Sequence, residues 1–426
     1  MPKILRQHEI GLAALLLGIG TIFACGLSYA QGDWLPSSIT VTTDDHIVAL
    51  LASYDVYGLV KLDQTGNILW RKRHGVRDES DFHALTIAPF DDGGFIVLGH
   101  HSYDHPVFRI YDRDGRQLRE FSLDIPTILG ALFRLSDGNY LVGGGELPRR
   151  VEDGHTGAGL LAKFDAAGSI LWQQRYDYEN ETDIFSIGEL KNGEIALAMN
   201  YGEMSKFGPV EAVVRIAVCD SSGNVLRSTN LTDTLAANSG AMKSSVGTIY
   251  LSYIESLDSE FNEEEWDTLN EVPEDELSEE DIYKIYSMMF RYVTRVKAID
   301  PKSLKTMWES GPLIFNGIFN PVVSLWPDNK VVVFGGEIGN SRAEICNAEG
   351  KVERTVRAST KIPRLNNVNV GDCDASDSAA YALGSSTVID PPDFEFNPGT
   401  FIYKVTADSD EPEWFKFIDT GFPPEP

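Results

Sequence analysis

The chain has 426 residues, 42% of them hydrophobic and 10% aromatic, and this composition excludes wholesale disorder because it can bury a large core. Its 64 acidic and 36 basic residues give a net charge of −28, which argues against nucleic acid and anionic membranes as partners, since both require a positive face. Length alone predicts two or three domains at about 150 residues each, but closed all-β folds exceed that size as one unit.

Residues 1–30 are predicted to be an export signal. Lys3 and Arg6 form a short basic region, and Ile10–Phe23 is an apolar stretch that is too short to span a membrane comfortably. Small side chains at Ser28 and Ala30 predict cleavage before residue 31.

A competing interpretation places a lipid on Cys25, because residues 22–26 resemble a bacterial lipobox. Either route exports the mature chain to the periplasm or beyond, and membrane attachment is expected only if Cys25 is acylated. Three cysteines then remain, an odd number that excludes full pairing within the chain. Of these, Cys219 and Cys346 occupy equivalent positions two repeats apart, which favours buried thiols.

The mature sequence repeats itself. Gly58–Trp70 and Gly159–Trp172 are copies of one unit once a single inserted residue is allowed, and weaker copies lie at Phe108–Leu118 and Val214–Leu226. Each copy predicts a β-hairpin, because an apolar strand ends at Asp and a Gly supplies the positive φ of a tight turn. Another hairpin signal precedes most copies, so each unit is expected to hold four short strands, A to D.

These units predict an all-β, seven-bladed β-propeller of four-stranded antiparallel blades, with six or eight blades as alternatives. Blades packed face to face around an axis bury one another and leave no long edge exposed. The single propeller domain is expected over residues 31–426. The predicted blades span residues 34–75, 81–124, 125–181, 182–234, 235–313, 314–360 and 361–419. Tryptophans are expected to pack between blades from the D strands, at Trp70, Trp172, Trp308 and Trp414.

The pattern Leu-Val-Lys-Leu-Asp-x-x-Gly-Asn-Ile-Leu-Trp at 59–70, followed by Asp-Gly-Gly-Phe-Ile-Val-Leu-Gly at 92–99, resembles propeller repeats of exported bacterial proteins of the quinoprotein-like or WD40-like superfamily. Asp300–Trp308 is similar to the tryptophan-docking motif of quinoprotein propellers, with Leu304 where that motif has Gly. The resemblance implies a fold, and many such propellers only bind. Quinoprotein dehydrogenases hold pyrroloquinoline quinone with calcium and adjacent half-cystines. This chain has no vicinal cysteine pair, so that cofactor is not expected.

Loop lengths predict which face binds a ligand. The A–B and C–D turns are minimal, whereas the B–C connections are long, and in a meander these emerge on the same face as the D–A connections. The long B–C connections are expected at His100–Pro106, Gly145–Gly159, Asn200–Ala212, Glu255–Phe290 and Ser385–Thr400. Long loops on a rigid scaffold are where binding usually occurs, so we expect this face to carry the function.

An acidic insertion over residues 255–290 is the largest departure from the repeat, with fourteen carboxylates between Glu255 and Asp281. One interpretation is a lid or docking arm for a cationic partner, and the other is a solvated excursion with a packed helix after Ser278. The binding candidates here are Glu263, Glu264, Glu265 and Asp267. Asp258–Asn262 only partly matches a calcium loop, so no cofactor is predicted and calcium remains an alternative.

Histidines concentrate in the second unit, and the binding candidates are His100, His101, Asp104 and His105, with His155 in the third unit. Metal binding or acid–base work competes with the simpler interpretation of exposed loop histidines. No metal site is predicted. Asp372–Asp377 is expected to be an acidic A–B turn.

Two functions are therefore expected, of which the first is favoured, and an outer-membrane assembly or envelope scaffold lipoprotein is a third possibility that requires acylation of Cys25. The first is a non-catalytic exported binding or scaffold module that takes a protein or glycan on the long-loop face. The second is a propeller enzyme, of hydrolase, lyase or quinoprotein type, with its site at the axial mouth. No catalytic residue can be named, because the chain has no nucleotide loop, no Gly-x-Ser-x-Gly elbow and no His-Glu-x-x-His.

Overall fold

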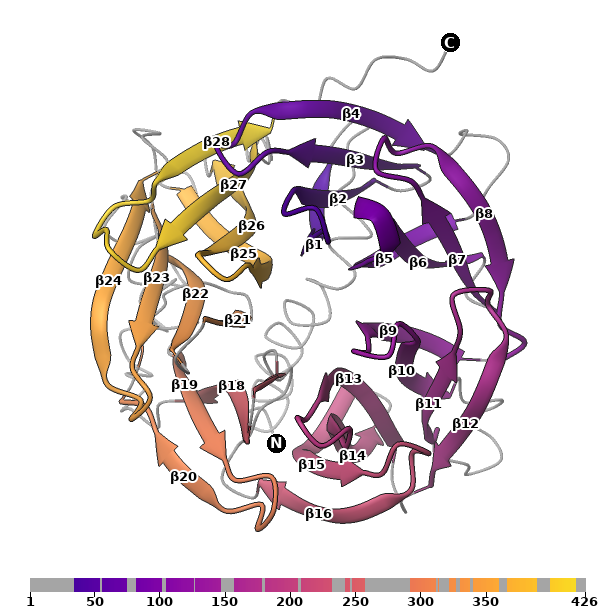
Figure 1. Cartoon of the computed structure of the whole chain (residues 1–426). Helices are drawn as coiled ribbons and strands as arrows, with labels where there is room; N and C mark the ends of the chain where they lie inside the picture. The colour runs from indigo at the N-terminus through magenta and orange to yellow at the C-terminus, as the bar shows by residue number, and fades with distance from the viewer. Residues whose placement is uncertain are drawn as a thin grey trace, which may run out of the picture.

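The computed structural model describes residues 34–53, 56–74, 82–101, 105–125, 127–146, 157–177, 181–205, 208–231, 242–245, 247–256, 292–311, 313, 322–326, 330–337, 340–359, 366–388 and 399–418. These residues form seven four-stranded sheets, each with its strands in chain order and each pair antiparallel. The sheets are arranged around a common axis (Figure 1). The predicted seven-bladed β-propeller is confirmed.

Each blade runs from an innermost strand A to an outermost strand D (Figure 1). The A strands are β1 (Leu35–Val41), β5 (Phe82–Pro89), β9 (Thr127–Arg134), β13 (Glu181–Glu189), β17 (Met242–Ser245), β21 (Val322–Leu325) and β25 (Asn366–Ala375). The B strands are β2 (Ile47–Ser53), β6 (Phe95–His101), β10 (Tyr140–Glu146), β14 (Ile195–Ser205), β18 (Thr248–Ser256), β22 (Val331–Glu337) and β26 (Ala379–Val388). The C strands are β3 (Val56–Leu62), β7 (His105–Tyr111), β11 (Gly159–Phe164), β15 (Gly208–Cys219), β19 (Tyr292–Ile299), β23 (Asn340–Cys346) and β27 (Gly399–Thr406). The D strands are β4 (Ile68–His74), β8 (Gln117–Ser122), β12 (Ile170–Tyr176), β16 (Val225–Leu231), β20 (Thr306–Glu309), β24 (Val352–Ser359) and β28 (Trp414–Ile418). One 3₁₀ turn, η1 (Asp91–Gly93), lies between β5 and β6.

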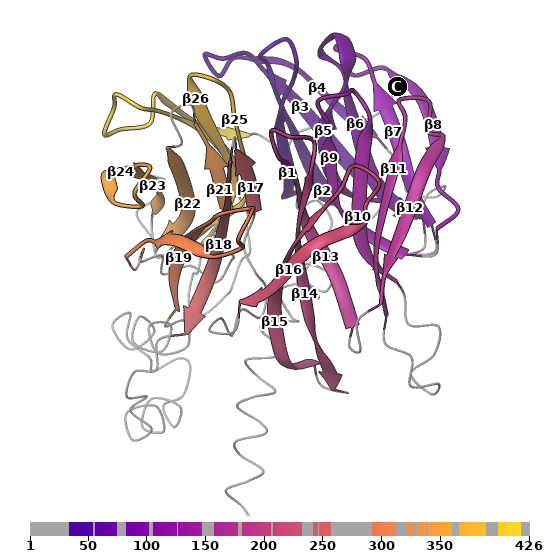
Figure 2. The same cartoon turned by 60° about the horizontal axis from the view of Figure 1, so that its bottom comes forward.

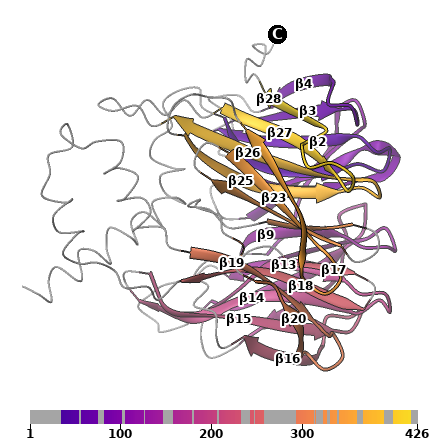
Figure 3. The ribbon, with the colours of Figure 1, turned by 90° about the vertical axis from the view of Figure 1, so that its left-hand side faces the viewer.

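The hydrophobic core lies between the blades. Seven clusters of buried apolar residues each join two neighbouring sheets, and the last of them joins the seventh blade to the first through Tyr381, Ile402 and Ile47. The innermost strands also contact one another in succession, and β25 contacts β1 to complete the circle. Seen from the side, the blades lie next to one another as tilted sheets (Figure 3). Closure therefore makes every blade depend on two neighbours for its burial.

The C–D turns are short and hydrogen-bonded within themselves, and they define what we call the turn face. In the first blade Asp63 Oδ1 accepts hydrogen bonds from the backbone N of Thr65 at 2.9 Å and of Asn67 at 2.8 Å, and Gly66 has a φ of 80°. Slight burial raises the pKa of Asp63, but these hydrogen bonds outweigh it and hold that pKa at about 2. Leu304, in the position of the motif glycine, adopts a φ of 55°. The predicted Asp-capped turn is confirmed in the first five blades, of which the fifth has no Gly, whereas Asn347 and Ser409 make these contacts in the sixth and seventh.

Each D strand docks one side chain onto the C–D turn of the next blade. In four blades this residue is tryptophan: Trp70 and Trp414 donate their indole N–H groups to turn carbonyls at 3.2 and 2.9 Å, and a Cβ at Gly223 would lie 2.8 Å from the ring of Trp172. In the other three blades arginine takes the same register position. The arginine contacts join Arg119 to the carbonyl of Ala166, Arg227 to the carbonyl of Pro301 and Arg354 to the carboxylate of Asp410. The expected packing of the tryptophans is confirmed, and the arginines are an addition that the structure reveals.

Two predicted B–C loops are wrong in extent, because strands continue through them. β6 runs to His101 and β7 begins at His105, while β14 runs to Ser205 and β15 begins at Gly208. The β-sheet hydrogen bonds of these hairpins extend further than the repeat pattern indicated. The strands of each blade run between the turn face and the opposite face, as Figure 2 shows. That opposite face, with the B–C and D–A connections, is called the connection face below.

Candidate functional site

Most predicted binding residues lie outside the part of the chain that the structure describes. This holds for the lipidation candidate Cys25 and for Asp104, His155, Glu263, Glu264, Glu265 and Asp267. His101 and His105 lie opposite each other where β6 ends and β7 begins, but their side chains are outside the described part. His100 is the predicted residue whose side chain can be placed.

His100 lies inside β6 and is buried, with 1% of its surface exposed. Its Nε2 atom is 3.2 Å from both the backbone N and the backbone O of Leu129, which belongs to β9 of the third blade. Burial lowers the pKa of His100, which favours the neutral ring. The expectation of an exposed loop histidine is therefore wrong at this position, since His100 joins two blades.

A buried polar group also lies between the first and second blades. Arg109 donates to the hydroxyl of Tyr57 at 3.1 Å and to Glu120 at 2.7 Å, and the Tyr57 hydroxyl contacts that of Tyr111. The ring of His74 stacks on Tyr57 with centroids 5.3 Å apart. Burial, together with the charges of Arg109 and Lys72, lowers the pKa of His74 to about 4. Tyr57 and Tyr111 are 1% and 0% exposed, so this group supports blade packing and offers no accessible site.

The innermost strands carry a charged cluster around the axis. Asp372 on β25 accepts hydrogen bonds from Ser38 Oγ at 2.7 Å and from the backbone N of Ile39 at 2.9 Å, both on β1. Asp374 similarly accepts the backbone N of Val41 at 2.8 Å. Asp372 and Asp374 lie within β25, which extends to Ala375. The prediction that they belong to an acidic A–B turn is therefore wrong. Their carboxylates join the last blade to the first.

Lys243 adds a cation to this cluster from β17 of the fifth blade, with its Nζ 3.9 Å from Asp374 Oδ1. Burial opposes its charge, but Asp374 and Asp372 outweigh that effect and raise the pKa of Lys243. Burial raises the pKa of Asp372 in spite of Lys243 and the hydrogen bonds it accepts. Backbone N–H groups of β1 already donate to the carboxylates of Asp372 and Asp374. The cluster is therefore suited to holding the last blade against the first.

Asp183 on β13 is the ionisable residue of the innermost strands that has no partner among the described residues. The side chain of Asp183 can still be reached by solvent. The surrounding protein nevertheless removes most of the water around its carboxylate, and this desolvation raises the pKa of Asp183 to about 6. A Cβ on Gly145 of the third blade would lie 3.4 Å from Asp183 Oδ1. A carboxyl group with such a pKa could exchange a proton near neutral pH.

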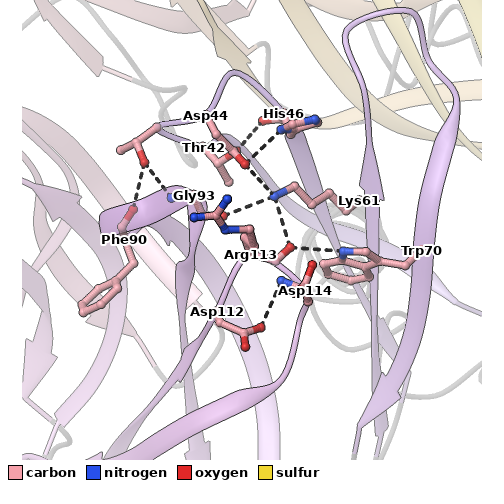
Figure 4. A network of polar contacts seen from close by, with 11 residues as sticks. Thr42, Asp44, His46, Lys61, Trp70, Phe90, Gly93, Asp112, Arg113 and Asp114 are labelled. Atoms are coloured by element: carbon pink, nitrogen blue, oxygen red, sulfur yellow. Dashed lines mark hydrogen bonds and ion pairs between the residues drawn. The ribbon is translucent and has the colours of Figure 1, made fainter.

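On the turn face, Lys61 joins the first two blades (Figure 4). It lies on β3 and is 2% exposed, and its Nζ donates to Asp44 at 3.2 Å, to the carbonyl of Gly93 at 3.3 Å and to the carbonyl of Arg113 at 3.2 Å. Thus one ammonium group satisfies acceptors from both A–B turns and from the C–D turn of the second blade. All three donor positions are used, so this lysine stabilises the seam.

Asp44 completes that network with two further contacts, one from Thr42 Oγ1 at 2.5 Å and one from His46 Nδ1 at 3.1 Å (Figure 4). Partial burial raises its pKa, but the contacts with Thr42, His46 and Lys61 outweigh burial and hold the pKa below its usual value. Asp44 is therefore ionised at neutral pH and balances the buried ammonium group.

The sequence contained a signal for these lysines that its motifs did not capture. Lys61 and Lys163 stand at the same position of the repeat, inside otherwise apolar strands, and Lys163 Nζ donates to Asp137 Oδ2 at 2.7 Å. A charge recurring within a buried strand indicates a recurring partner, here an Asp of the A–B turn. Asp183 had no such signal, because its environment comes from neighbouring blades.

The described residues can also be compared with the requirements of a metal site and of a reactive thiol. No group of three or more His, Cys, Asp or Glu side chains among them is placed to hold a metal ion. Cys219, Cys346 and Cys373 are free and buried, as expected of inert thiols, and burial raises the pKa of Cys219 to about 11 and that of Cys346 to about 12. No helix within the described ranges is long and apolar enough to cross a membrane.

Comparison with known proteins identifies similar folds. The virginiamycin B lyase of Staphylococcus aureus is 8% identical, with a TM-score of 0.50 over 83% of this chain and 93% of that chain. The WD40 domain of Pan2 from Neurospora crassa is 12% identical, with a TM-score of 0.48 over 82% and 86%. The quinohemoprotein alcohol dehydrogenase of Comamonas testosteroni is 11% identical, with a TM-score of 0.40 over 86% and 67%.

No protein-family model matches the chain, and no curated protein matches its sequence. At identities of 8 to 12% a structural likeness is evidence of fold alone. The chain is a seven-bladed β-propeller whose structural neighbours include both binding domains and enzymes.

Proposed function

We propose that this chain is an exported, non-catalytic propeller that binds a protein or a glycan through its connection face. Support comes from the difference between the two faces. On the connection face β18 ends at Ser256 and β19 begins only at Tyr292, whereas the C–D turns on the turn face are short and are contacted by side chains of the preceding blade. A rigid ring with one variable face is suited to presenting loops to a partner.

The proposed contact residues are the predicted ones on these connections: His101, Asp104, His105, His155, Glu263, Glu264, Glu265 and Asp267. His100 is not a proposed contact residue, because its side chain is buried between two blades. The acidic insertion would favour a partner with a basic surface, since its carboxylates attract cations over roughly a Debye length of 8 Å at physiological salt.

The runner-up is a propeller enzyme with its site near the axis. Asp183 favours it, because an exposed carboxyl with a pKa of about 6 and no partner among the described residues is what an acid–base catalyst needs. The innermost carboxylates Asp372 and Asp374 weigh against it, because backbone amides occupy them.

The proposal can be tested by capture with matched variants. Purified mature chain would be immobilised, and envelope proteins and a glycan array would be probed with wild type, with a variant in which a Gly-Ser linker replaces residues 258–288, and with Lys163→Met on the turn face. We expect a partner that binds wild type and Lys163→Met equally well. The same partner should bind more weakly to the variant without the insertion, or to a variant in which another connection has been replaced. The proposal would be contradicted if binding survived the replacement of every connection but was lost in the turn-face variant Lys163→Met.

Export is tested separately by mass spectrometry of the mature amino terminus. Cleavage before residue 31 gives an unmodified Gln31 or its pyroglutamate, whereas the lipoprotein route gives a diacylated or triacylated Cys25. An intact Met1 in the native host would contradict export.

A further inference from the structure

All eight histidines of the chain lie within residues 1–155, and residues 156–426 contain none. Two of them are packed into the seams on either side of the second blade, which is formed by β5 to β8 (Figure 1). His74 belongs to β4 of the first blade and contacts Tyr111 of the second. His100 belongs to β6 of the second blade and contacts Leu129 of the third. Because histidine ordinarily gains its charge in mild acid, the groups that acid can charge are concentrated around one blade.

The ring of His74 lies against two tyrosine rings. Its centroid is 5.3 Å from that of Tyr57, on which it stacks, and 4.9 Å from that of Tyr111, which it meets at an angle. Its Nε2 atom is buried and has no hydrogen-bond partner among the described residues. The charged groups that face the ring are Arg109 and Lys72, and burial together with these two cations lowers the pKa of His74 to about 4.

Among the described residues, no group beside His74 would balance a charge on its ring. Tyr57 and Tyr111 stay neutral in acid, because burial raises the pKa of both hydroxyls. The nearby carboxylate of Glu120 is already paired with Arg109 at 2.7 Å. Protonation would therefore place an imidazolium between aromatic rings and close to two cations, which disfavours the packed seam.

His100 makes a comparable contact on the other side of the second blade. It is 1% exposed, and its Nε2 atom is 3.2 Å from both the backbone N and the backbone O of Leu129 on β9. Its Nδ1 atom is buried and unpartnered within the described part of the chain. An imidazolium can only donate hydrogen bonds, so protonation would leave the Leu129 N–H without this acceptor and bury a second N–H with nothing to accept it.

The titratable side chain that faces His100 among the described residues is His83, which lies directly opposite it on β5. The residue opposite it on β7 is Pro106, and on β9 it meets the backbone of Leu129. Burial lowers the pKa of His100, a charge on His83 would lower it further, and the Leu129 contact offsets this only in part. Two protonated histidines opposite each other would also repel, as like charges across a strand pair do.

We propose that the second blade is an acid-sensitive element of the ring, whose contacts with the first and third blades open in mild acid while the other blades remain packed. The folded chain binds fewer protons than the unfolded chain at both histidines, because the pKa of each is lower in the folded state. The stability of the two seams is therefore complete above pH 6.5, the ordinary pKa of histidine, and falls as the pH falls below it. For His74 the loss continues until the pH reaches its folded pKa of about 4.

This acid response is a property of the ring and does not depend on what binds the connection face. A consequence that rests on the proposed function is the release of a partner, because β6 and β7 carry the proposed contacts His101 and His105. Measurements on the chain without any partner separate the acid response from that consequence.

Hydrogen–deuterium exchange of the purified chain at pH 7 and pH 5, corrected for the effect of pH on the chemical exchange rate, measures the opening directly. We expect the amides of β5 to β7 to open about tenfold more often at pH 5, because the His74 pKa of about 4 lies well below the ordinary value of 6.5. The amides of the fifth to seventh blades are the internal control, since their sequence contains no histidine, and they should not open more often.

A double variant assigns the response to the two histidines. His74→Phe keeps an aromatic ring against Tyr57 and cannot be protonated, and His100→Gln keeps an oxygen that can accept the Leu129 N–H. The variant H74F/H100Q should exchange like wild type at pH 7 and lose the acid response of the second blade. If the double variant fails to fold, as judged by circular dichroism, each single variant should lose the response at its own seam.

Three results would overturn the proposal. The first is wild-type exchange in the second blade that is no faster at pH 5 than at pH 7 after correction. The second is an acid response that persists undiminished in the variants. The third is opening that is spread evenly over all seven blades, because carboxylates throughout the ring would then be responsible.

Discussion

The turn face and the connection face of this propeller follow different rules. On the turn face each C–D turn repeats one design, an Asp, Asn or Ser near its start and a tryptophan or arginine docked from the preceding blade. On the connection face the B–C lengths differ widely, from residues 54–55 to residues 257–291. This difference indicates that ring closure constrains the C–D turns of the turn face and leaves the lengths of the B–C connections on the other face free to vary. We therefore expect changes to the turn face to affect stability and changes to the connection face to affect binding.

The largest expected effect is at Gly350, in the C–D turn of the sixth blade. It has a φ of 78°, and a side chain there would collide with the ring of Trp308. Gly350→Val should lower the free energy of unfolding by about 3 kcal/mol, measured by urea denaturation. Gly138→Ala is the control, because its φ is 84° but nothing lies within 4 Å, so about 1 kcal/mol is expected. Equal losses would mean that the tryptophan contact contributes nothing.

Loss of the Lys61 network should come next. Lys61→Met removes the donor for Asp44, for the buried carbonyl of Gly93 and for the partly buried carbonyl of Arg113, so the free energy of unfolding should fall by about 2 kcal/mol. Lys163→Met breaks a single pair with the more exposed Asp137, and less than about 1 kcal/mol is expected. If Lys61→Met proved harmless, the seam between the first two blades would not depend on its polar contacts.

A smaller, pH-dependent effect is expected at Asp183. Its pKa of about 6 in the folded chain exceeds its ordinary value of 3.8, so ionisation destabilises the fold progressively as pH rises through 6. Asp183→Asn should therefore be more stable than wild type at pH 8, by no more than about 1 kcal/mol given the exposure of the side chain, and equal to it near pH 3. Thermal unfolding at several pH values measures this. A difference that grows toward acid pH has the opposite sign and would contradict the assignment.

The smallest stability effect should follow the largest change in sequence. Replacing residues 258–288 by a short linker removes none of the described strands, and the free energy of unfolding should change by less than about 0.5 kcal/mol. Urea denaturation of this variant, compared with Gly350→Val, contrasts the two faces directly. A loss of several kcal/mol would show that the insertion supports the ring.

The repeat made the fold predictable, because Asp and Gly mark the C–D turns of the first four blades and Trp70 and Trp172 mark the same strand in two blades. The arginines that replace tryptophan were missed, since Arg119 and Arg227 are ordinary surface residues in sequence and acquire their role from the register of the D strand. His100 was misplaced for a related reason, because the strand continues past the point where the apolar pattern ends. Pairs between distant blades, such as Lys243 with Asp374, depend on ring closure and leave no local pattern.

Hydrogen–deuterium exchange of the purified chain, with and without a partner captured as proposed above, tests the division between the two faces most directly. Amides of the B–C and D–A connections should gain protection on binding, while those of the C–D turns, already slow because they are hydrogen-bonded, should not change. Protection confined to the C–D turns would contradict the proposed function.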